Sequence, residues 1–326
     1  MTVRVSVVVP TYKRPQFLER CLDALLCQDY EPSRYEIVVA DDAASCETRR
    51  QVEYYAQRAA CRRLKVRYVP VTYTHGPAAA RNAGWRVAQG EIIAFTDDDC
   101  IPEHGWLCEG TTAFVDGVVG VMGSISAPLH IGLPTDYEKN AAGLEGGEFL
   151  TANCFYRRCA LEQASGFDER FTMAYREDTD LWFTLLERDS RLVRAPSARV
   201  VHPIRPAPWG VSLKQQQRSA FNMLLYKKHP AEYIRRVAPG PPWRYYRILA
   251  ALLAAVVALL SGKRLPALAA AGAWAFMTGR FCLQRLHGTS RAPGHVAEMI
   301  VTSILIPPLS IFWRVYGAIK YHVAFL

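Results

Sequence analysis

The chain has 326 residues, of which 50% are apolar, and a formal net charge of +9. This length and apolar content suffice for one large domain plus a smaller module and exclude a disordered chain. Its nine cysteines include no Cys-x-x-Cys pair, which is typical of a reducing cytosol and argues against a disulfide framework or a paired-cysteine zinc site.

The N-terminal third alternates between apolar strand patterns and helical patterns. The β-branched run from Val3 to Pro10 predicts a strand buried on both faces. Pro15 suits the first turn of a helix, which apolar residues at helical spacing continue to Leu26. The second predicted strand, residues 35–42, ends in a pair of carboxylates. The chain therefore begins as a strand, a helix and a strand.

This alternation continues with a polar helix, a strand near residues 64–69, a helix over residues 77–89 and a strand over residues 91–96. Such a pattern predicts an open, mostly parallel α/β sheet. Ligands of open α/β sheets collect outside the carboxyl ends of the strands. We therefore expect the polar residues that follow these strands to converge on one cleft.

Three adjacent acids, Asp97, Asp98 and Asp99, follow the fourth predicted strand. Neighbouring carboxylates repel one another, so the cluster is best explained by a shared divalent cation. Hard oxygen ligands suit Mg²⁺ or Mn²⁺. A solvated acidic turn is the alternative explanation, because two acids one residue apart also occur by chance.

Residues at the other strand ends are suited to a nucleotide. Tyr12 offers a ring for stacking on a base, Arg14 and Arg81 offer charge for phosphate, and Asp41 or Asp42 can accept a hydrogen bond from base or ribose. The chain has no Gly-x-Gly-x-x-Gly after its first strand and no P-loop motif, which argues against a dinucleotide and a P-loop nucleotide. We therefore expect a nucleotide held by side chains and a metal.

Six motifs, which occur in the same order across about the first 230 residues, resemble those of the family 2 glycosyltransferases with the GT-A fold. They are VVVPTYKR, IVVADD, GPAAARNAG, FTDDDC, SGFDERF and REDTDLWFTLL. The resemblance implies a Rossmann-like, mostly parallel sheet flanked by helices. It also implies a set of nucleotide-sugar ligands, namely Pro10, Thr11, Tyr12, Arg14, Asp41, Asp42, Arg81, Asn82, Asp97 and Asp98.

The same resemblance implies the metal and catalytic residues. Asp97 and Asp99 would be the DxD acids that hold Mn²⁺ or Mg²⁺, and His202 would complete the metal site. Asp178, with Glu177 beside it, would supply the base that deprotonates the acceptor. Helix capping is the alternative role for this acidic pair, and a structural role is the alternative for His202.

The C-terminal part has a different composition. Residues 240–326 contain nine Lys or Arg and one acid, so they contribute +8 of the net charge. Basic and aromatic residues border two apolar runs, Ile248–Gly262 and Leu265–Gly279, as at a membrane interface. Each run has about 15 residues, so a crossing hairpin and a hairpin within one leaflet both remain open. A soluble helical subdomain is the remaining alternative.

The last segment, Val296–Leu326, contains Pro307 and Pro308, which predict a break into two interfacial pieces. Because the basic residues alternate with long apolar runs, we expect a lipid partner and no nucleic acid. The predicted organisation is a GT-A catalytic domain over residues 1–235 and a helical membrane-association module over residues 236–326. Residues 1–100 would form the nucleotide-binding half, and residues 101–235 the acceptor and catalytic half.

The predicted activity is inverting, metal-dependent transfer of a sugar from a UDP-linked donor to a hydroxyl of a lipid-linked or cell-surface glycan precursor. One base is enough for inversion, and no second acid in the sequence suggests a nucleophile. The predicted location is the cytoplasmic membrane, with the catalytic domain facing the cytosol. Two alternatives remain, a polyprenyl-phosphate glycosyltransferase and a non-catalytic membrane protein that binds a nucleotide sugar as a sensor or scaffold.

Overall fold

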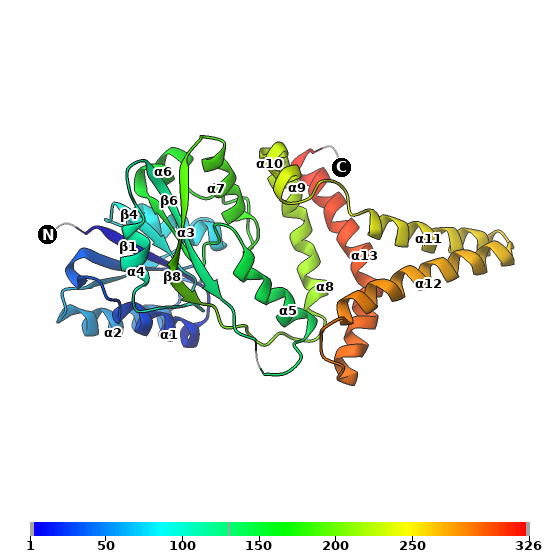
Figure 1. Ribbon diagram of the computed structural model, residues 1–326, viewed down its shortest axis with the longest axis horizontal. Helices are drawn as coiled ribbons and strands as arrows, with labels where there is room; N and C mark the ends of the chain where they lie inside the picture. The colour runs from blue at the N-terminus through cyan, green and yellow to red at the C-terminus, as the bar shows by residue number, and fades with distance from the viewer. Residues whose placement is uncertain (1–2, 130, 324–326) are drawn as a thin grey trace. The chain divides into compact units, whose positions relative to one another are not determined.

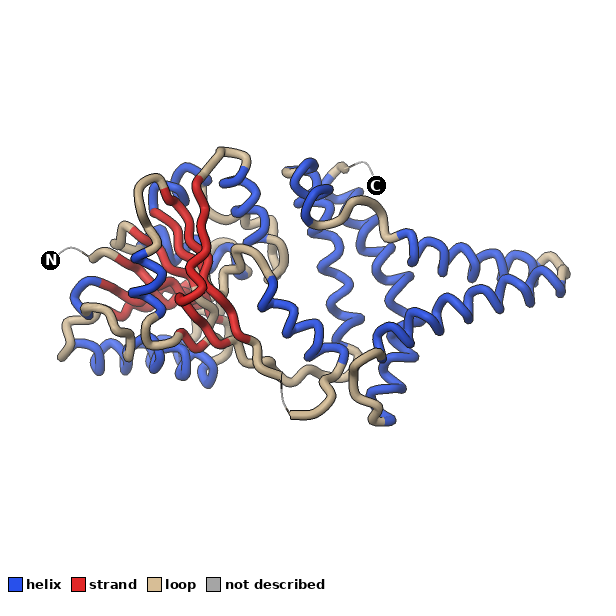
Figure 2. Tube along the Cα trace, viewed as in Figure 1, coloured by secondary structure: helices blue, strands red, loops and turns tan. Residues whose placement is uncertain are grey.

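The computed structural model describes residues 3–129 and 131–323, which form two compact units. The first, called here the sheet unit, holds Met1–Pro128 and Ala142–Ile204. The second, called here the helical unit, holds Leu129–Ala141 and Arg205–Leu326. Figure 2 shows that all strands lie in the sheet unit. The units divide after residue 204, whereas the sequence pattern changes near residue 235, and the predicted two-domain boundary stays a prediction.

One mixed sheet forms the centre of the sheet unit, with the strand order β3-β2-β1-β4-β7-β6-β8-β5 (Figure 1). The strands are β1 Val5–Thr11, β2 Tyr35–Asp41, β3 Lys65–Pro70, β4 Ile92–Phe95, β5 Ile101–Pro102, β6 Val118–Ser126, β7 Cys154–Arg157 and β8 Arg191–Val201. The first four are parallel, as predicted, because the connections between them are helical crossovers. β7 runs antiparallel to β4 and β6, and β5 runs antiparallel to β8.

Helices cover both faces of this sheet. They are α1 Pro15–Leu26, α2 Cys46–Ala60, α3 Pro77–Val87, α4 Trp106–Thr112, α6 Arg158–Ala164 and α7 Glu177–Leu186. Side chains alternate along a strand, so Val7 of β1 packs in the same core as α1, α2 and α4. Val8 points to the opposite face, where α3 approaches closely at Gly84. An added Cβ there would lie 2.5 Å from Val8 Cγ1.

The described part of the helical unit contains α-helices and one 3-10 helix, Gln216–Arg218. The α-helices are α5 Asp136–Ala142, whose last residue belongs to the sheet unit, α8 Val211–Gln215, α9 Ser219–Lys228, α10 Pro230–Arg236, α11 Trp243–Leu260, α12 Arg264–Leu286 and α13 Pro293–Tyr321. α13 packs directly on α9, where a Cβ added to Gly317 would lie 2.6 Å from the Ala220 carbonyl oxygen.

The predicted break at Pro307 and Pro308 is wrong, because α13 continues through both prolines as one helix. Each proline removes one backbone hydrogen bond from the helix interior. Packing of α13 against α9, α11 and α12 supplies contacts that the local sequence does not reveal. These tertiary contacts offset the lost hydrogen bonds and keep the helix continuous.

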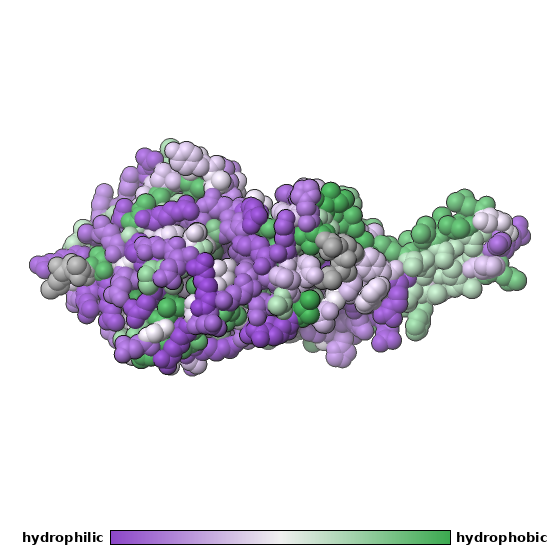
Figure 3. Space-filling model, turned by 90° about the horizontal axis from the view of Figure 1, so that it is seen from above, coloured by the Kyte–Doolittle hydropathy of each residue, from purple (hydrophilic) through white to green (hydrophobic). Residues whose placement is uncertain are grey.

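α11 and α12 form an antiparallel hairpin with apolar side chains on its outside (Figure 3). Leu260 and Leu265 are 83% and 81% exposed. Lys263 and Arg264 lie where α11 connects to α12, and Figure 3 shows a hydrophilic tip on the hairpin. Among the described residues, α11 and α13 are long and apolar enough to cross a membrane by length and composition. Only 6% of α11 is buried within the protein, against 33% of the apolar stretch of α13.

Candidate active site

The acidic turn lies at the carboxyl edge of the parallel strands. Asp97, Asp98 and Asp99 follow β4 directly, and the Cys100 backbone N–H donates to the Asp97 carbonyl at 3.1 Å. β1 lies between β2 and β4, so Thr11 at its end is next to both neighbouring strand ends. The predicted convergence of these polar residues at one sheet edge is therefore present in the structure.

Asp98 connects the acidic turn to the end of β1 and the start of α1. Its carboxylate accepts hydrogen bonds from Thr11 Oγ1 at 2.7 Å and from Arg14 Nη1 at 3.3 Å. The side chain is only 4% exposed. Burial raises the pKa of Asp98 to about 6, although Thr11 and Arg14 favour the carboxylate. Asp98 and Arg14 thus hold the edge of the site together, and their contact with a nucleotide stays a prediction.

Asp41 closes the turn between β2 and α2. This fully buried carboxylate accepts hydrogen bonds from the backbone N–H groups of Ala43 at 3.0 Å and Ser45 at 2.7 Å, and from Tyr68 Oη at 3.1 Å. These contacts give Asp41 a structural role at the sheet edge. The predicted contact of Asp41 with base or ribose is not tested by them.

Asp42 faces the loop that leads into α3. Its carboxylate accepts a hydrogen bond from the Gly76 backbone N–H at 3.0 Å and lies 3.0 Å from His75 Nδ1. Tyr12, on the neighbouring strand end, is 51% exposed, whereas Pro10 is buried within β1. Tyr12 is therefore accessible for the predicted base stacking, and Pro10 contributes to the position of that strand end.

Arg81 joins three elements of the site. Its Nη1 donates to Glu177 Oε1 at 2.8 Å, and its Nη2 donates to Asp97 Oδ1 at 2.8 Å. Burial alone raises the pKa of Asp97, but Arg81, together with His202 and Arg14, outweighs burial and lowers it. Arg81 therefore holds the acidic turn and α7 together, a role that was not predicted from the sequence. Its predicted contact with phosphate stays a prediction.

Asn82, next to Arg81 on α3, uses its amide within the protein. Its Nδ2 donates to the Phe167 carbonyl oxygen and to Glu169 Oε1, both at 2.8 Å. Its Oδ1 accepts from Trp85 Nε1 at 2.8 Å and from the Phe167 backbone N–H at 3.0 Å. Asn82 thus fixes the turn that precedes α7, and its predicted contact with the donor stays a prediction.

The two predicted catalytic acids differ in their surroundings. Burial and the Asp178 charge raise the pKa of Glu177 to about 7, against the opposing effect of Arg81. Burial also raises the pKa of Asp178, which accepts hydrogen bonds from the Thr179 N–H at 2.6 Å and Thr179 Oγ1 at 3.2 Å. Glu177 is thus paired with Arg81, whereas the hydrogen bonds of Asp178 among the described residues are those with its neighbour Thr179. The assignment of Asp178 as the base stays a prediction.

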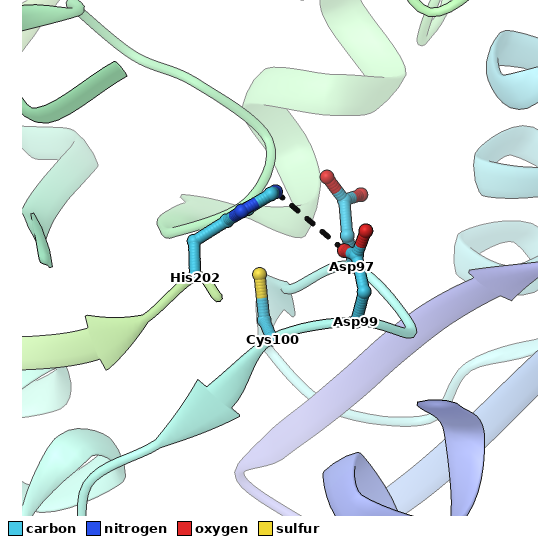
Figure 4. Close-up of side chains that lie close together, drawn as sticks. All are labelled: Asp97, Asp99, Cys100 and His202. Atoms are coloured by element: carbon cyan, nitrogen blue, oxygen red, sulfur yellow. Dashed lines mark ion pairs between the residues drawn. The ribbon is translucent and has the colours of Figure 1, made fainter. Parts of the chain in front are cut away.

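A candidate metal centre lies at the acidic turn (Figure 4). One ligand atom each from Asp97, Asp99, Cys100 and His202 lies within 4.8 Å of the others. His202 Nε2 is 3.6 Å from Asp99 Oδ1. The buried His202 Nδ1 has no hydrogen-bond partner among the described residues. Two carboxylates and an imidazole form a donor set that fits Mn²⁺ or Mg²⁺.

His202 reaches this centre through the sheet. β5 pairs antiparallel with β8, with Ile101 opposite Val201, so the residues one step beyond, Cys100 and His202, lie close together. Sequence reasoning assigned no role to Cys100. Its position directly after three acids was the signal available in the sequence.

A separate cavity of about 770 Å³ lies at the opposite edge of the sheet. Its lining residues are Val3, Arg4, Arg34, Gln89, Gly90, Glu91 and Arg158. Most of them directly precede β1, β2 or β4, so they mark the amino ends of these strands. Because ligands of open α/β sheets bind at the carboxyl ends, this cavity is not the candidate active site.

Two protein-family models match this chain, Glycosyl transferase family 2 over residues 6–177 and Glycosyl transferase family group 2 over residues 92–314. Glycosyltransferase AglE of Haloferax volcanii is 31% identical over 225 residues, which are 66% of this chain and 71% of that protein. The pre-mycofactocin glycosyltransferase of Mycobacterium tuberculosis is 27% identical over 286 residues, 80% of this chain and 57% of that protein.

A Campylobacter jejuni protein, GalNAc(5)-diNAcBac-PP-undecaprenol beta-1,3-glucosyltransferase, is 27% identical over 57% of this chain and 61% of its own length. Among solved structures, a similar one is the mannosyltransferase PcManGT from Pyrobaculum calidifontis in complex with GDP-Man and Mn²⁺. It is 21% identical, has a TM-score of 0.56, and the match covers 99% of this chain and 88% of that one. At this identity, the likeness concerns the fold alone.

Proposed function

Because the chain belongs to glycosyl transferase family 2, we propose that it is an inverting, metal-dependent enzyme that transfers a sugar from a UDP-linked donor. Its GT-A α/β fold agrees with the fold predicted from the sequence. The observation that carries the proposal is the grouping of Asp97, Asp99 and His202 at the carboxyl edge of the parallel strands. The proposed acceptor is a hydroxyl of a lipid-linked or cell-surface glycan precursor.

Asp97, Asp99 and His202 are the residues that would hold a divalent ion beside the donor diphosphate. When bound, such an ion neutralises charge that develops on the leaving diphosphate. Arg81 fixes Asp97 in place from the other side, with a donor–acceptor distance of 2.8 Å. The acidic turn is thus preorganised by ion pairs before any ligand arrives, which lowers the cost of ordering it on binding.

Asp178 is the proposed base. It takes the proton of the acceptor hydroxyl as the hydroxyl oxygen bonds to the anomeric carbon and the bond from that carbon to the diphosphate breaks. The raised pKa of Asp178 suits this task, because a base is most effective when its pKa approaches the working pH. Attack from the face opposite the diphosphate inverts the anomeric centre, so no second catalytic acid is required.

Tyr12 and Asp42 are the proposed contacts to the nucleotide base, with uracil as the proposed base. Tyr12 is exposed at the end of β1, and Asp42 has a carboxylate at the end of the adjacent β2. Thr11, Arg14 and Asp98 maintain this edge through their mutual hydrogen bonds. A stacked ring and a carboxylate acceptor together can recognise a base without a glycine-rich loop.

The α11–α12 hairpin is the proposed membrane anchor. At 1.5 Å per residue, helices of 18 and 23 residues extend about 27 and 35 Å, against about 30 Å of bilayer hydrocarbon. Its exposed leucines would be buried among lipid tails. Trp243 and Arg244, at the start of α11, would lie at the membrane–water interface. The proposed location is the cytoplasmic membrane, with the sheet unit in the cytosol, where nucleotide sugars are made.

The undecaprenol-linked substrate in the name of the Campylobacter relative supports a lipid-linked acceptor for this chain. The basic, apolar composition of residues 236–326 supports the same conclusion, because it favours a lipid surface over nucleic acid. The proposed module boundary therefore remains near residue 235, where the membrane-associated composition begins.

Donor hydrolysis tests the proposal. Full-length protein in detergent is incubated with Mn²⁺ and UDP-, GDP- and dTDP-sugars, and released nucleoside diphosphate is measured with and without EDTA. We expect one UDP-sugar to be hydrolysed and EDTA to abolish the reaction. Hydrolysis that persists in EDTA would overturn the metal requirement, and hydrolysis of only a GDP- or dTDP-sugar would overturn the assignment of the base.

A further inference from the structure

The Cys100 thiol belongs to the candidate metal centre and is not explained by transfer chemistry. Figure 4 shows its sulfur directed toward the space between His202 and the two acids. The residue is completely buried, and the turn from Asp97 holds its backbone. Pairing of β5 with β8 brings it beside His202. Cys100 therefore has the position of a ligand as well as that of a core residue.

The donor set at this centre is mixed in its chemical preference. Carboxylates suit Mg²⁺ and Mn²⁺, whereas a thiolate prefers softer ions such as Zn²⁺, Co²⁺ and Cd²⁺. Bonds of about 2.0 to 2.3 Å in a tetrahedral zinc site separate the ligand atoms by about 3.3 to 3.8 Å. The four candidate ligand atoms lie within 4.8 Å of one another. Movements of about 0.5 to 0.75 Å per side chain would therefore bring even the most widely separated pair to the spacing of a tetrahedral site.

We propose that this centre also captures a thiophilic divalent ion, of the Zn²⁺ class, through Asp97, Asp99, Cys100 and His202. This inference rests on the proposed function, because the same carboxylates would hold the ion used in transfer. As the metal–sulfur bond forms, the thiol proton passes to the buffer. Four protein ligands close the coordination sphere, whereas a catalytic ion needs open positions for substrate. Zinc bound in this way excludes the donor diphosphate and inhibits the enzyme.

Cobalt is the spectroscopic probe for this inference. The exposed thiols of the full-length protein in detergent are first alkylated, because they would bind metal elsewhere. They are Cys27, Cys46, Cys61, Cys108 and Cys159. Co²⁺ is then titrated in the absence of donor. We expect a near-ultraviolet sulfur-to-cobalt charge-transfer band and the intense visible bands of four-coordinate Co²⁺, both of which Zn²⁺ removes.

Two variants test whether Cys100 is the source of the charge-transfer band. Cys100→Ser should lose the charge-transfer band, whereas Cys21→Ser, at a cysteine in the same buried core but outside the four-ligand group, should keep it. Zn²⁺ affinity, measured by competition with Co²⁺, should fall more than about tenfold in Cys100→Ser, since even outer-shell metal contacts are worth that much. Mn²⁺ affinity, measured by electron paramagnetic resonance, should change less than Zn²⁺ affinity.

The outcomes separate this inference from the proposed function. Mn²⁺ and Co²⁺ binding without a sulfur-to-cobalt band overturns the role of Cys100 and leaves the proposed metal dependence standing. Absence of any binding, with and without UDP, overturns both. Because Cys100→Ser replaces a core residue, X-ray absorption of the alkylated wild-type protein with one equivalent of Zn²⁺ gives a test without a variant. A zinc–sulfur distance near about 2.3 Å supports the inference, and its absence overturns it.

Discussion

The sheet unit and the helical unit each have one feature that is unfavourable in water, and the two features differ. The sheet unit buries charge at one edge, where Arg81, Asp98, Asp99 and Glu177 are all nearly inaccessible to solvent. The helical unit instead exposes apolar side chains along the α11–α12 hairpin. Burying charge and exposing hydrocarbon both cost free energy in water. Each unusual surface is therefore the place of a proposed partner, a cation with phosphate in one case and lipid in the other.

Two arginines that form ion pairs, Arg81 and Arg285, also differ between the units. Arg81 in the sheet unit connects Asp97 and Glu177, both at the candidate active site. Arg285 in the helical unit pairs with Asp136 at 2.8 Å and donates to Thr302 Oγ1 at 2.6 Å. The first arrangement holds candidate catalytic groups, whereas the second joins α5, α12 and α13. A buried ion pair alone is thus no sign of a catalytic site, and the neighbouring chemistry decides its interpretation.

Removing the proposed metal ligand should have the largest effect on activity. Asp99→Asn keeps the shape of the side chain but removes one charge from the cluster. A metal contributes several kcal/mol to transition-state stabilisation, so we expect kcat/KM to fall on the order of 10³-fold. Mn²⁺ affinity should fall in parallel. Exposed Glu162→Gln on α6 is the control, and equal losses in the two variants would contradict the assignment.

Asp178→Asn should reduce turnover with a hydroxyl acceptor by at least about 10²-fold, because general-base catalysis is lost. Donor and Mn²⁺ affinity should remain, since Asp178 is outside the metal cluster. Single-turnover transfer and nucleotide binding measure these effects separately. Near-normal turnover in this variant would instead favour a polyprenyl-phosphate acceptor, which needs no base.

A charge placed on the hairpin should weaken membrane binding without loss of the fold. Leu253 is exposed near the middle of α11, and a Lys there costs about 2.5 to 3.5 kcal/mol at the centre of a membrane helix. We expect vesicle binding of Leu253→Lys to fall on the order of 100-fold in flotation assays. Val115→Lys, at an exposed valine of the sheet unit, should bind like the wild type. Equal binding by both variants would contradict the anchor.

The smallest expected effect concerns the pH dependence of stability in the sheet unit. Burial raises the pKa of Asp98 from 3.8 to about 6, so the folded state binds this proton more tightly than the unfolded state. The resulting stabilisation is complete below about pH 3.8 and is lost as the pH rises through about 6. Its upper limit is about 3 kcal/mol, or several degrees in melting temperature.

Asp98→Asn removes this titration, so its melting temperature should fall less than that of the wild type between pH 4.5 and pH 7. Asp23→Asn, at a surface carboxylate paired with Arg58, is the control and should keep the wild-type slope. If the melting temperatures of the wild type and of Asp98→Asn fall equally as the pH rises, protonation of Asp98 does not contribute to the pH dependence of stability.

The sequence alone determined the parallel half of the sheet, the start of α1 at Pro15 and the location of the acids at the carboxyl strand ends. Buried β-branched runs, helical spacing and proline stereochemistry act over a few residues, so these features can be predicted without tertiary information. The exposed apolar hairpin was predictable for the same reason, because its pattern is continuous along the chain.

Only the tertiary structure decided which distant groups meet. Arg81 and Glu177 are 96 residues apart, and no local pattern shows that a salt bridge joins them. Cys100 comes beside His202 because short β5 pairs with β8, and α13 passes through two prolines because neighbouring helices hold it. Side-chain periodicity specifies which face of a helix or strand is buried, but it does not specify which other element packs against that face. Long-range packing and ion pairing select that partner, and here they determine both the candidate metal centre and the continuity of the last helix.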